Sequence, residues 1–190
     1  MVAILSGKFK GQSLAVPKSG TRPTSSLVKK ALFDSLRTHL IDCSFCDLFA
    51  GSGAVGLEAL SQGASKVLLI ESNKQAFTCI KANITKLKCE QDCKAYLKKA
   101  HSFLESLEKD LETIDIFFLD PPYDIRPEDS SSYESLLLFF DKKNLKADCK
   151  IILETKDPER IEKKMPHLNS LSLMTKKAYG DSYLFFIQKY

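Results

Sequence analysis

The sequence of 190 residues lacks an unbroken apolar stretch near the roughly 18–20 residues that a membrane-spanning helix requires. The apolar run at its start is too short for the core of a signal peptide. Internal repeats and low-complexity tracts are also missing, which disfavours a solenoid. We therefore expect a cytoplasmic protein that does not associate with membranes.

The sequence also has little that would hold a metal ion. A structural zinc site needs four ligands at matched spacings, and the pair Cys43 and Cys46 has no matching second pair. The histidines His39, His101 and His167 stand singly. We therefore predict no metal site, and we interpret most of the six cysteines as reduced residues that pack as small hydrophobic side chains.

Positive charge is concentrated near the start of the chain. Hydrophobic residues make up 44% and charged residues 27% of the sequence, the balance of a soluble globular protein. Residues 1–40 carry seven Lys or Arg against one acid, whereas the whole chain has a net charge of only +4. A basic arm on a near-neutral body favours a polyanionic partner, and a solvated charged surface is the alternative. We predict an arm over residues 1–24 and one domain over residues 25–190.

The hydrophobic pattern predicts a hairpin and a helix, followed by alternating strands and helices. The hairpin spans residues 2–16, and Thr24 or Ser25 begins a helix that runs to about Leu40. Strands are expected at 45–49, 66–71, 93–97, 115–120, 150–155, 173–179 and 183–189, with helices at 54–62, 73–87, 102–109, 133–140 and 159–165. This order predicts an α/β fold with a mostly parallel sheet, closed by a C-terminal antiparallel hairpin. Ligands of such sheets bind beyond the carboxyl ends of the strands.

A glycine-rich turn follows the strand at 45–49. Gly51, Gly53 and Gly56 form a G-x-G-x-x-G pattern between a strand and a helix, where glycines allow a tight turn close to a ligand. Glu71 ends the next strand, and a carboxylate there can accept hydrogen bonds from both hydroxyls of a ribose. The combination favours a nucleoside site over a packing turn with a surface glutamate.

Asp47 indicates which nucleoside cofactor fits this turn. In a dinucleotide-binding fold the start of the helix receives a pyrophosphate, which an acid four residues before the first glycine would repel. The same carboxylate suits the positively charged sulfonium and amino group of S-adenosylmethionine (SAM). We therefore favour SAM as cofactor over a helix-capping role for Asp47.

The second motif is Asp120-Pro121-Pro122-Tyr123, at the end of the most apolar strand. An exocyclic base amine is a poor nucleophile because its lone pair is delocalised into the ring. The Asp120 carboxylate and a proline carbonyl can accept both amine hydrogens, which aims the lone pair at a methyl group. The prolines stiffen the loop, and Tyr123 offers a ring on which the base can stack. The alternative is a proline turn with a buried tyrosine.

These motifs together resemble the class I methyltransferases that modify nucleobase amines. Over almost the whole chain, the sequence is similar to the RsmD family, the bacterial 16S rRNA (guanine-N2)-methyltransferases. The similar segments are SGKFKGQSLAVP, TRPTSSLVKKALFDSL, DLFAGSGAVGLEALSQGA, FLDPPY and AYGDSYLFF. Many methyltransferases share the core motifs, whereas the KG…RPT arm and the YGDS tail are typical of this family.

The resemblance implies a Rossmann-like class I methyltransferase domain with a seven-stranded sheet. The enzyme would methylate a guanine N2 amine in 16S rRNA, presented by the assembled 30S subunit, and we expect a monomer. The cofactor-binding residues would be Asp47, Gly51, Ser52, Gly53, Gly56, Glu71, Ser72, Lys99 and Ala100. The catalytic residues would be Asp120, Pro121, Pro122 and Tyr123, and the RNA contacts would be Lys8, Lys10, Arg22 and Thr24.

One segment departs from the pattern of related enzymes, which often carry Asp or Asn near the end of the third strand for the adenine amine. Here that segment reads Leu97-Lys98-Lys99-Ala100, and lysine cannot accept a hydrogen bond. Either the backbone around Lys99 and Ala100 makes the contact, or the alignment is displaced by one residue.

Three other functions are compatible with parts of the pattern. DNA amine methyltransferases also carry DPPY but usually need a target-recognition region, and the residues between Gly56 and Asp120 are taken up by the fold. A non-enzymatic RNA-binding module would not need an intact glycine turn, Glu71 and DPPY. A protein-glutamine methyltransferase would carry Asn in place of Asp120.

Overall fold

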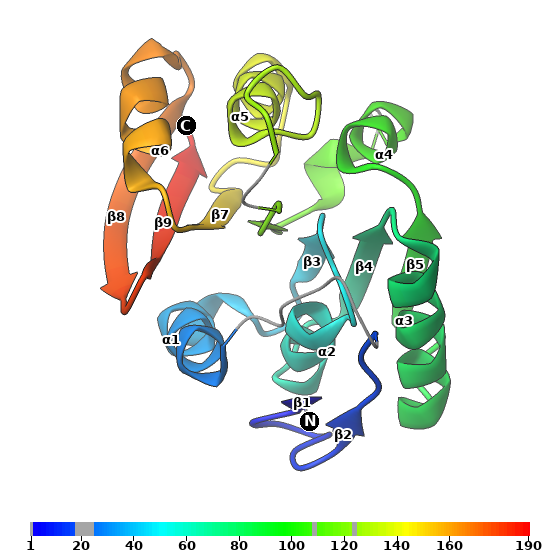
Figure 1. Ribbon diagram of the computed structural model, residues 1–190. Coiled ribbons are helices and arrows are strands. Elements are labelled where there is room, and N and C mark those ends of the chain that lie inside the picture. Colours follow the sequence, from blue (N-terminus) through cyan, green and yellow to red (C-terminus); the bar gives the residue numbers. More distant parts are fainter. Residues whose placement is uncertain (1, 18–24, 108–109, 123–124) are drawn as a thin grey trace. The chain divides into compact units, whose positions relative to one another are not determined.

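The computed structural model describes residues 2–17, 25–107, 110–122 and 125–190. The chain forms two compact units, Met1–Lys99 and Ala100–Tyr190, and each consists of helices and strands (Figure 1). The glycine turn belongs to the first unit, and Asp120, Pro121 and Pro122 belong to the second. Within the described ranges, no helix is long and apolar enough to cross a membrane.

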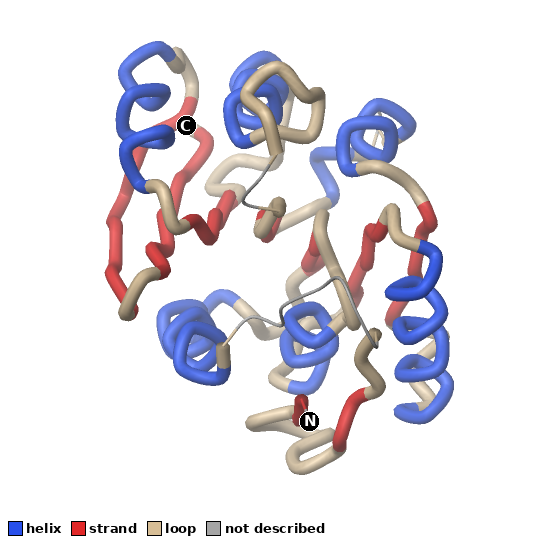
Figure 2. The backbone as a smooth tube through the Cα atoms, viewed as in Figure 1, coloured by secondary structure: helices blue, strands red, loops and turns tan. Residues whose placement is uncertain are grey.

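The first unit opens with the predicted hairpin, of which little is regular strand. Strands β1 (Val2–Ala3) and β2 (Ser13–Leu14) pair antiparallel. Figure 2 shows the chain between them as loop and turns without regular strand. The arm therefore depends on contacts with the rest of the unit, because so short a ladder adds little stability of its own.

Helix α1 (Ser26–Leu36) begins where the sequence predicts, because the Ser25 hydroxyl accepts a hydrogen bond from a first-turn N–H at 3.2 Å. It ends in a 3₁₀ turn, Arg37–His39, short of the predicted Leu40. Its buried face includes Lys29, which is only 2% exposed and which the apolar pattern did not predict to be buried.

Three parallel strands form the sheet of the first unit in the order β5, β4, β3. They are β3 (Ser44–Asp47), β4 (Lys66–Glu71) and β5 (Cys93–Leu97). Helix α2 (Ala54–Ser61) connects β3 to β4, and α3 (Lys74–Leu87) connects β4 to β5 (Figure 1). The carboxyl ends of β3 and β4 therefore lie at one edge, as the predicted ligand site requires.

The second unit pairs parallel and antiparallel strands. Its elements are α4 (Ala100–Ser106), a 3₁₀ turn (Leu111–Thr113), β6 (Ile116–Leu119), α5 (Tyr133–Lys142), β7 (Lys150–Thr155), α6 (Pro158–Lys164), a second 3₁₀ turn (Met165–His167), β8 (Leu171–Tyr179) and β9 (Ser182–Lys189). β6 pairs with β7 in parallel, and β9 pairs antiparallel with both β7 and β8. The four residues of β6 are all buried, which fits its continuous apolar sequence.

The predicted α/β class is confirmed: the pairs β3–β4 and β4–β5 of the first unit and the pair β6–β7 of the second are parallel, the chain ends in an antiparallel hairpin, and an N-terminal hairpin and helix come first. The boundaries of the strands at 66–71, 93–97 and 150–155 agree with the prediction. Helix α4 is also shifted, since it begins at Ala100 instead of residue 102 and ends at Ser106 instead of residue 109.

Candidate functional site

The glycine loop (residues 48–53) leaves the carboxyl end of β3 and is tied back to β4. The Ala50 N–H donates to the Ile70 carbonyl at 2.9 Å. Gly51 has φ +54°, and a Cβ built there would meet nothing within 4 Å, so its outer side is open. A backbone that turns sharply beside open space is the arrangement predicted for close approach of a cofactor.

Gly56 has a different role from the other glycines of the motif. A Cβ at Gly56 would lie 2.3 Å from the Leu69 Cδ2 atom, because α2 packs closely on β4 at this point. The third glycine therefore permits helix–strand packing and supports the loop from below. Its predicted cofactor role is indirect in this geometry.

Asp47 is the most deeply buried acid at this edge, with 1% of its surface exposed. One of its oxygens accepts a hydrogen bond from the Phe49 N–H at 3.3 Å. Burial raises the pKa of Asp47 to about 7, helped by the nearby Glu71 charge and opposed by the backbone N–H groups of Phe49 and Gly56. A cation bound here would offset that cost, which fits the positively charged end of SAM.

Glu71 is held in place by two backbone donors at the end of β4. Its Oε2 atom accepts from the Gly51 N–H at 2.8 Å, and its Oε1 atom accepts from the Asn73 N–H at 2.7 Å. Each carboxylate oxygen has a further lone pair for a ribose hydroxyl. Glu71 thus links the glycine loop to the start of α3, and a bound nucleoside would contact both.

The other predicted cofactor residues lie at or near this edge. Ser52 is buried in the glycine loop, and Ser72 is exposed directly after Glu71. Lys99 is exposed at the end of the first unit, whereas Ala100 is buried and starts α4 of the second. The side chain of Lys99 offers no acceptor for an adenine amine.

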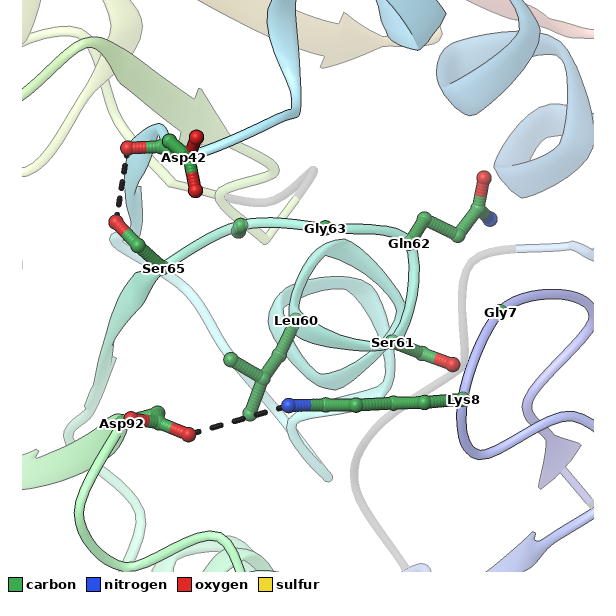
Figure 3. Close-up of a pocket in the computed structure, with 10 residues that line it drawn as sticks. Gly7, Lys8, Asp42, Leu60, Ser61, Gln62, Gly63, Ser65 and Asp92 are labelled. Carbon is green, nitrogen blue, oxygen red and sulfur yellow. Dashed lines mark hydrogen bonds and ion pairs between the residues drawn. The ribbon is translucent and has the colours of Figure 1, made fainter.

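The two described lysines of the arm lie in its exposed loop. Lys8 lines a pocket together with the end of α2, and its Nζ atom lies 3.9 Å from Asp92 (Figure 3). Asp92 precedes β5, so this pocket lies at the amino ends of the strands, away from Asp47 and Glu71. Lys10 is exposed. The predicted RNA contacts Arg22 and Thr24 lie outside the described residues.

A buried ion pair, which the sequence analysis missed, fastens the arm. Glu58 on α2 and Lys29 on α1 are 0% and 2% exposed, and their charged atoms lie 2.9 Å apart. Glu58 also accepts hydrogen bonds from the N–H groups of Leu5 and Ser6, at 2.8 and 2.9 Å. The available signal was a single acid in the otherwise apolar helix AVGLEALS.

In the second unit, Asp120 and Pro121 follow β6 directly. Asp120 is half-buried, Pro121 is buried and Pro122 is exposed. The Pro122 carbonyl accepts a hydrogen bond from the Ile125 N–H at 3.1 Å. Tyr123 lies outside the described residues, so its predicted stacking role stays a prediction.

A bidentate ion pair between two helices contacts the backbone of Ile125. Arg160 on α6 donates to both carboxylate oxygens of Glu134, each at 2.8 Å, and to the Ile125 carbonyl at 3.4 Å. Burial opposes ionisation of Glu134, but the Arg160 hydrogen bonds hold its pKa below the ordinary value. The backbone of Ile125 is therefore linked through Arg160 and Glu134 to two helices of its own unit.

The geometry defines a class: an α/β protein with acids and a glycine loop at the carboxyl edge of its sheet, as in Rossmann-like methyltransferases. A family model described as "conserved hypothetical protein 95" matches residues 2–188, and the chain belongs to this family, the RsmD-type methyltransferases. Named relatives support this. The chain is 32% identical over 155 residues to "Ribosomal RNA small subunit methyltransferase D" of Haemophilus influenzae, covering 81% of this chain and 78% of that protein.

The Escherichia coli protein of the same name is 37% identical over 123 residues, which cover 64% of this chain and 60% of that protein. Among solved structures, a putative methyltransferase from Escherichia coli matches with a TM-score of 0.80 and 28% identity, covering 99% of this chain and 97% of that one. A putative methyltransferase solved in complex with SAH matches with a TM-score of 0.70 and 16% identity, covering 90% and 51%. The predictions of a methyltransferase and of SAM as its cofactor are confirmed by these comparisons.

Proposed function

We propose that this protein transfers a methyl group from SAM to the exocyclic N2 amine of a guanine in small-subunit rRNA. The observation that carries the proposal is membership of a family whose named relatives are small-subunit rRNA methyltransferases, together with an intact Asp120-Pro121-Pro122-Tyr123 motif. The proposed substrate form is the assembled 30S particle, and the enzyme is a cytoplasmic monomer. The predicted arm over residues 1–24 contacts RNA, and residues 25–190 form the methyltransferase domain.

The first unit supplies the cofactor site in this proposal. Glu71 binds the ribose hydroxyls, the glycine loop allows close approach at Gly51, and buried Asp47 balances positive charge. When bound, SAM supplies an electrophilic methyl group on a sulfonium. Since Asp47 and Glu71 are already held by backbone N–H groups, little reorganisation is needed for binding.

The second unit supplies the acceptors for the base amine. The Asp120 carboxylate accepts one amine hydrogen, and a backbone carbonyl of the proline segment accepts the other. These acceptors would direct the nitrogen lone pair at the methyl carbon, so that the carbon–nitrogen bond would form as the carbon–sulfur bond breaks and S-adenosylhomocysteine leaves, and Asp120 would receive the proton that the nitrogen loses. The Pro122 carbonyl already holds the Ile125 N–H, so the Pro121 carbonyl is the better candidate for the second acceptor.

The test offers the purified protein labelled SAM with three substrates: 30S subunits that lack the modification, naked 16S rRNA, and duplex DNA. Label recovered as N2-methylguanosine from subunits supports the proposal, and label in DNA alone overturns it in favour of a DNA methyltransferase. Label in naked rRNA would indicate that the RNA alone is a substrate, whereas label only in subunits would indicate that the assembled particle is needed.

Asp120→Ala provides the matched test of the catalytic assignment. We expect kcat to fall by about 100-fold to 10,000-fold, while the Kd for SAM changes little. Asp120→Asn keeps an acceptor oxygen and should lose less. Turnover of Asp120→Ala at the wild-type rate would contradict the proposed role.

A further inference from the structure

Asn83 on α3 is a buried polar side chain that neither the sequence analysis nor the proposed function uses. It is 1% exposed, and it makes three hydrogen bonds to backbone groups far away in the sequence. Its amide nitrogen donates to the Ala15 carbonyl and to the Ser52 carbonyl, both at 2.9 Å. Its oxygen accepts from the Ala15 N–H at 2.8 Å. One side chain thus joins the arm to the glycine loop.

On the loop side, the contact adds a second restraint to the peptide between Ser52 and Gly53, whose N–H already donates to the Ala50 carbonyl at 2.6 Å. Ser52 lies between Gly51 and Gly53, which have φ values of +54° and +81°. The Asn83 amide holds the carbonyl of the same peptide from outside the loop, and this bond is maintained because a buried donor of this kind is costly to leave without an acceptor.

On the arm side, the contact holds a segment that packs poorly by itself. Ala15 and Val16 are exposed although they follow β2 directly, and the paired hydrogen bonds from Asn83 secure the backbone at this point. The chain continues from Pro17 to the segment that contains Arg22 and Thr24, two of the predicted RNA contacts. Asn83 therefore holds the backbone of the arm two residues before Pro17.

We propose that Asn83 is a positioning residue that couples cofactor binding in the glycine loop to RNA binding by the arm. The Ser52 carbonyl, the Asn83 amide and the Ala15 backbone form one hydrogen-bonded path from the loop that would contact the cofactor to the arm. By thermodynamic linkage, RNA bound to the arm strengthens cofactor binding by the same factor. The inference rests on the proposed function, because it takes the arm as an RNA contact.

Lys86, three residues further along α3, provides a matched control. Its Nζ atom donates to the Ser13 carbonyl at 2.6 Å, so it holds the arm without touching the glycine loop. Lys86→Ala should weaken RNA binding equally with and without cofactor. Asn83→Asp keeps an oxygen for the Ala15 N–H but has no N–H for either carbonyl, so it should remove the coupling.

The experiment measures the Kd for unmodified 30S subunits with and without saturating SAH, for wild type, Asn83→Asp and Lys86→Ala. We expect SAH to tighten subunit binding by about fivefold or more in wild type and in Lys86→Ala, but not in Asn83→Asp. Equal ratios in wild type and Asn83→Asp, or no effect of SAH in wild type, overturn the inference. A protein that methylates subunits without this coupling keeps its proposed function, whereas one that binds no SAH fails the proposed function itself.

A second measurement needs only the wild-type protein, so it stands even if Asn83→Asp does not fold. Amide hydrogen exchange is followed at Ala15 and at Leu5, whose N–H is held by Glu58 and not by Asn83. We expect SAH to slow exchange at Ala15 several-fold and to leave Leu5 unchanged. Equal effects at the two amides contradict a specific path through Asn83.

Discussion

Two buried glutamates, one in each unit, have very different surroundings. Glu58 on α2 accepts hydrogen bonds from the arm backbone and from Gln62, and it forms an ion pair with Lys29. Glu154 on β7 is 3% exposed, and its Oε2 atom has no hydrogen-bond partner in the parts of the chain that the structure describes. Burial raises the pKa of Glu154 to about 7, against an opposing hydrogen bond from Ser182.

The difference separates a structural acid from acids that respond to their surroundings. Glu58 has donors on every side and fastens the arm, whereas Glu154 is short of donors and holds its proton near neutral pH. Asp47 resembles Glu154 in this respect, although it belongs to the same unit as Glu58. A buried acid with a raised pKa therefore indicates a place where pH or a ligand's charge acts on the protein.

Removing the charge of Glu58 should produce the largest loss of stability. In Glu58→Gln the buried Lys29 ammonium loses the negative charge that it pairs with. We expect the free energy of unfolding to fall by about 3–5 kcal/mol. Urea denaturation measures this change. Glu159→Gln is the control, because its ion pair with Lys163 is exposed and should contribute no more than about 0.5 kcal/mol. Equal effects of the two substitutions would contradict the role assigned to Glu58.

The side chains that hold the arm, Lys29, Glu58 and Asn83, could not be predicted from the sequence. Short apolar runs were sufficient for the strands at 66–71 and 150–155, most of whose side chains are buried, and the weaker pattern at 93–97 also gave the correct bounds. The burial of Lys29 and Glu58 could not be predicted, because each charge is compensated only by a partner on a different helix. Asn83 gave no signal either, since its three partners are backbone groups 31 and 68 residues away.

The candidate site was more predictable than the arm because its chemistry is local in sequence. The order of Asp47, the glycines and Glu71 placed both acids at the carboxyl ends of adjacent strands, and the structure has them there. The raised pKa of Asp47 was not predictable, because it depends on burial by residues that are distant in the sequence. The indirect, packing role of Gly56 likewise became clear only from its distance to Leu69.

Glu154→Gln should change the pH dependence of stability. The pKa of Glu154 is higher in the folded state than the ordinary 4.5, so the folded protein binds more protons and wild-type stability falls as pH rises from about 4.5 through 7. The amide does not titrate, and we expect the variant to be more stable than wild type by about 1–3 kcal/mol at pH 8. Thermal unfolding between pH 5 and 8 measures this, and parallel curves would contradict the assignment.

The effect expected at Asp47 is the smallest, and its sign is opposite to that at Glu154. Stability falls with pH through Glu154, whereas affinity for SAM should rise with pH through Asp47. A cationic cofactor favours the ionised carboxylate, so affinity for SAM should rise by about tenfold between pH 6 and 8, as Asp47 loses its proton near pH 7. Binding at pH 7 should release protons, which calorimetry in two buffers detects. Asp47→Asn should bind SAM more weakly and with little dependence on pH, while Glu154→Gln should keep the wild-type dependence. If the slope followed Glu154 instead, the acid that senses the cofactor would lie in the second unit, and Asp47 would be only a buried strand end.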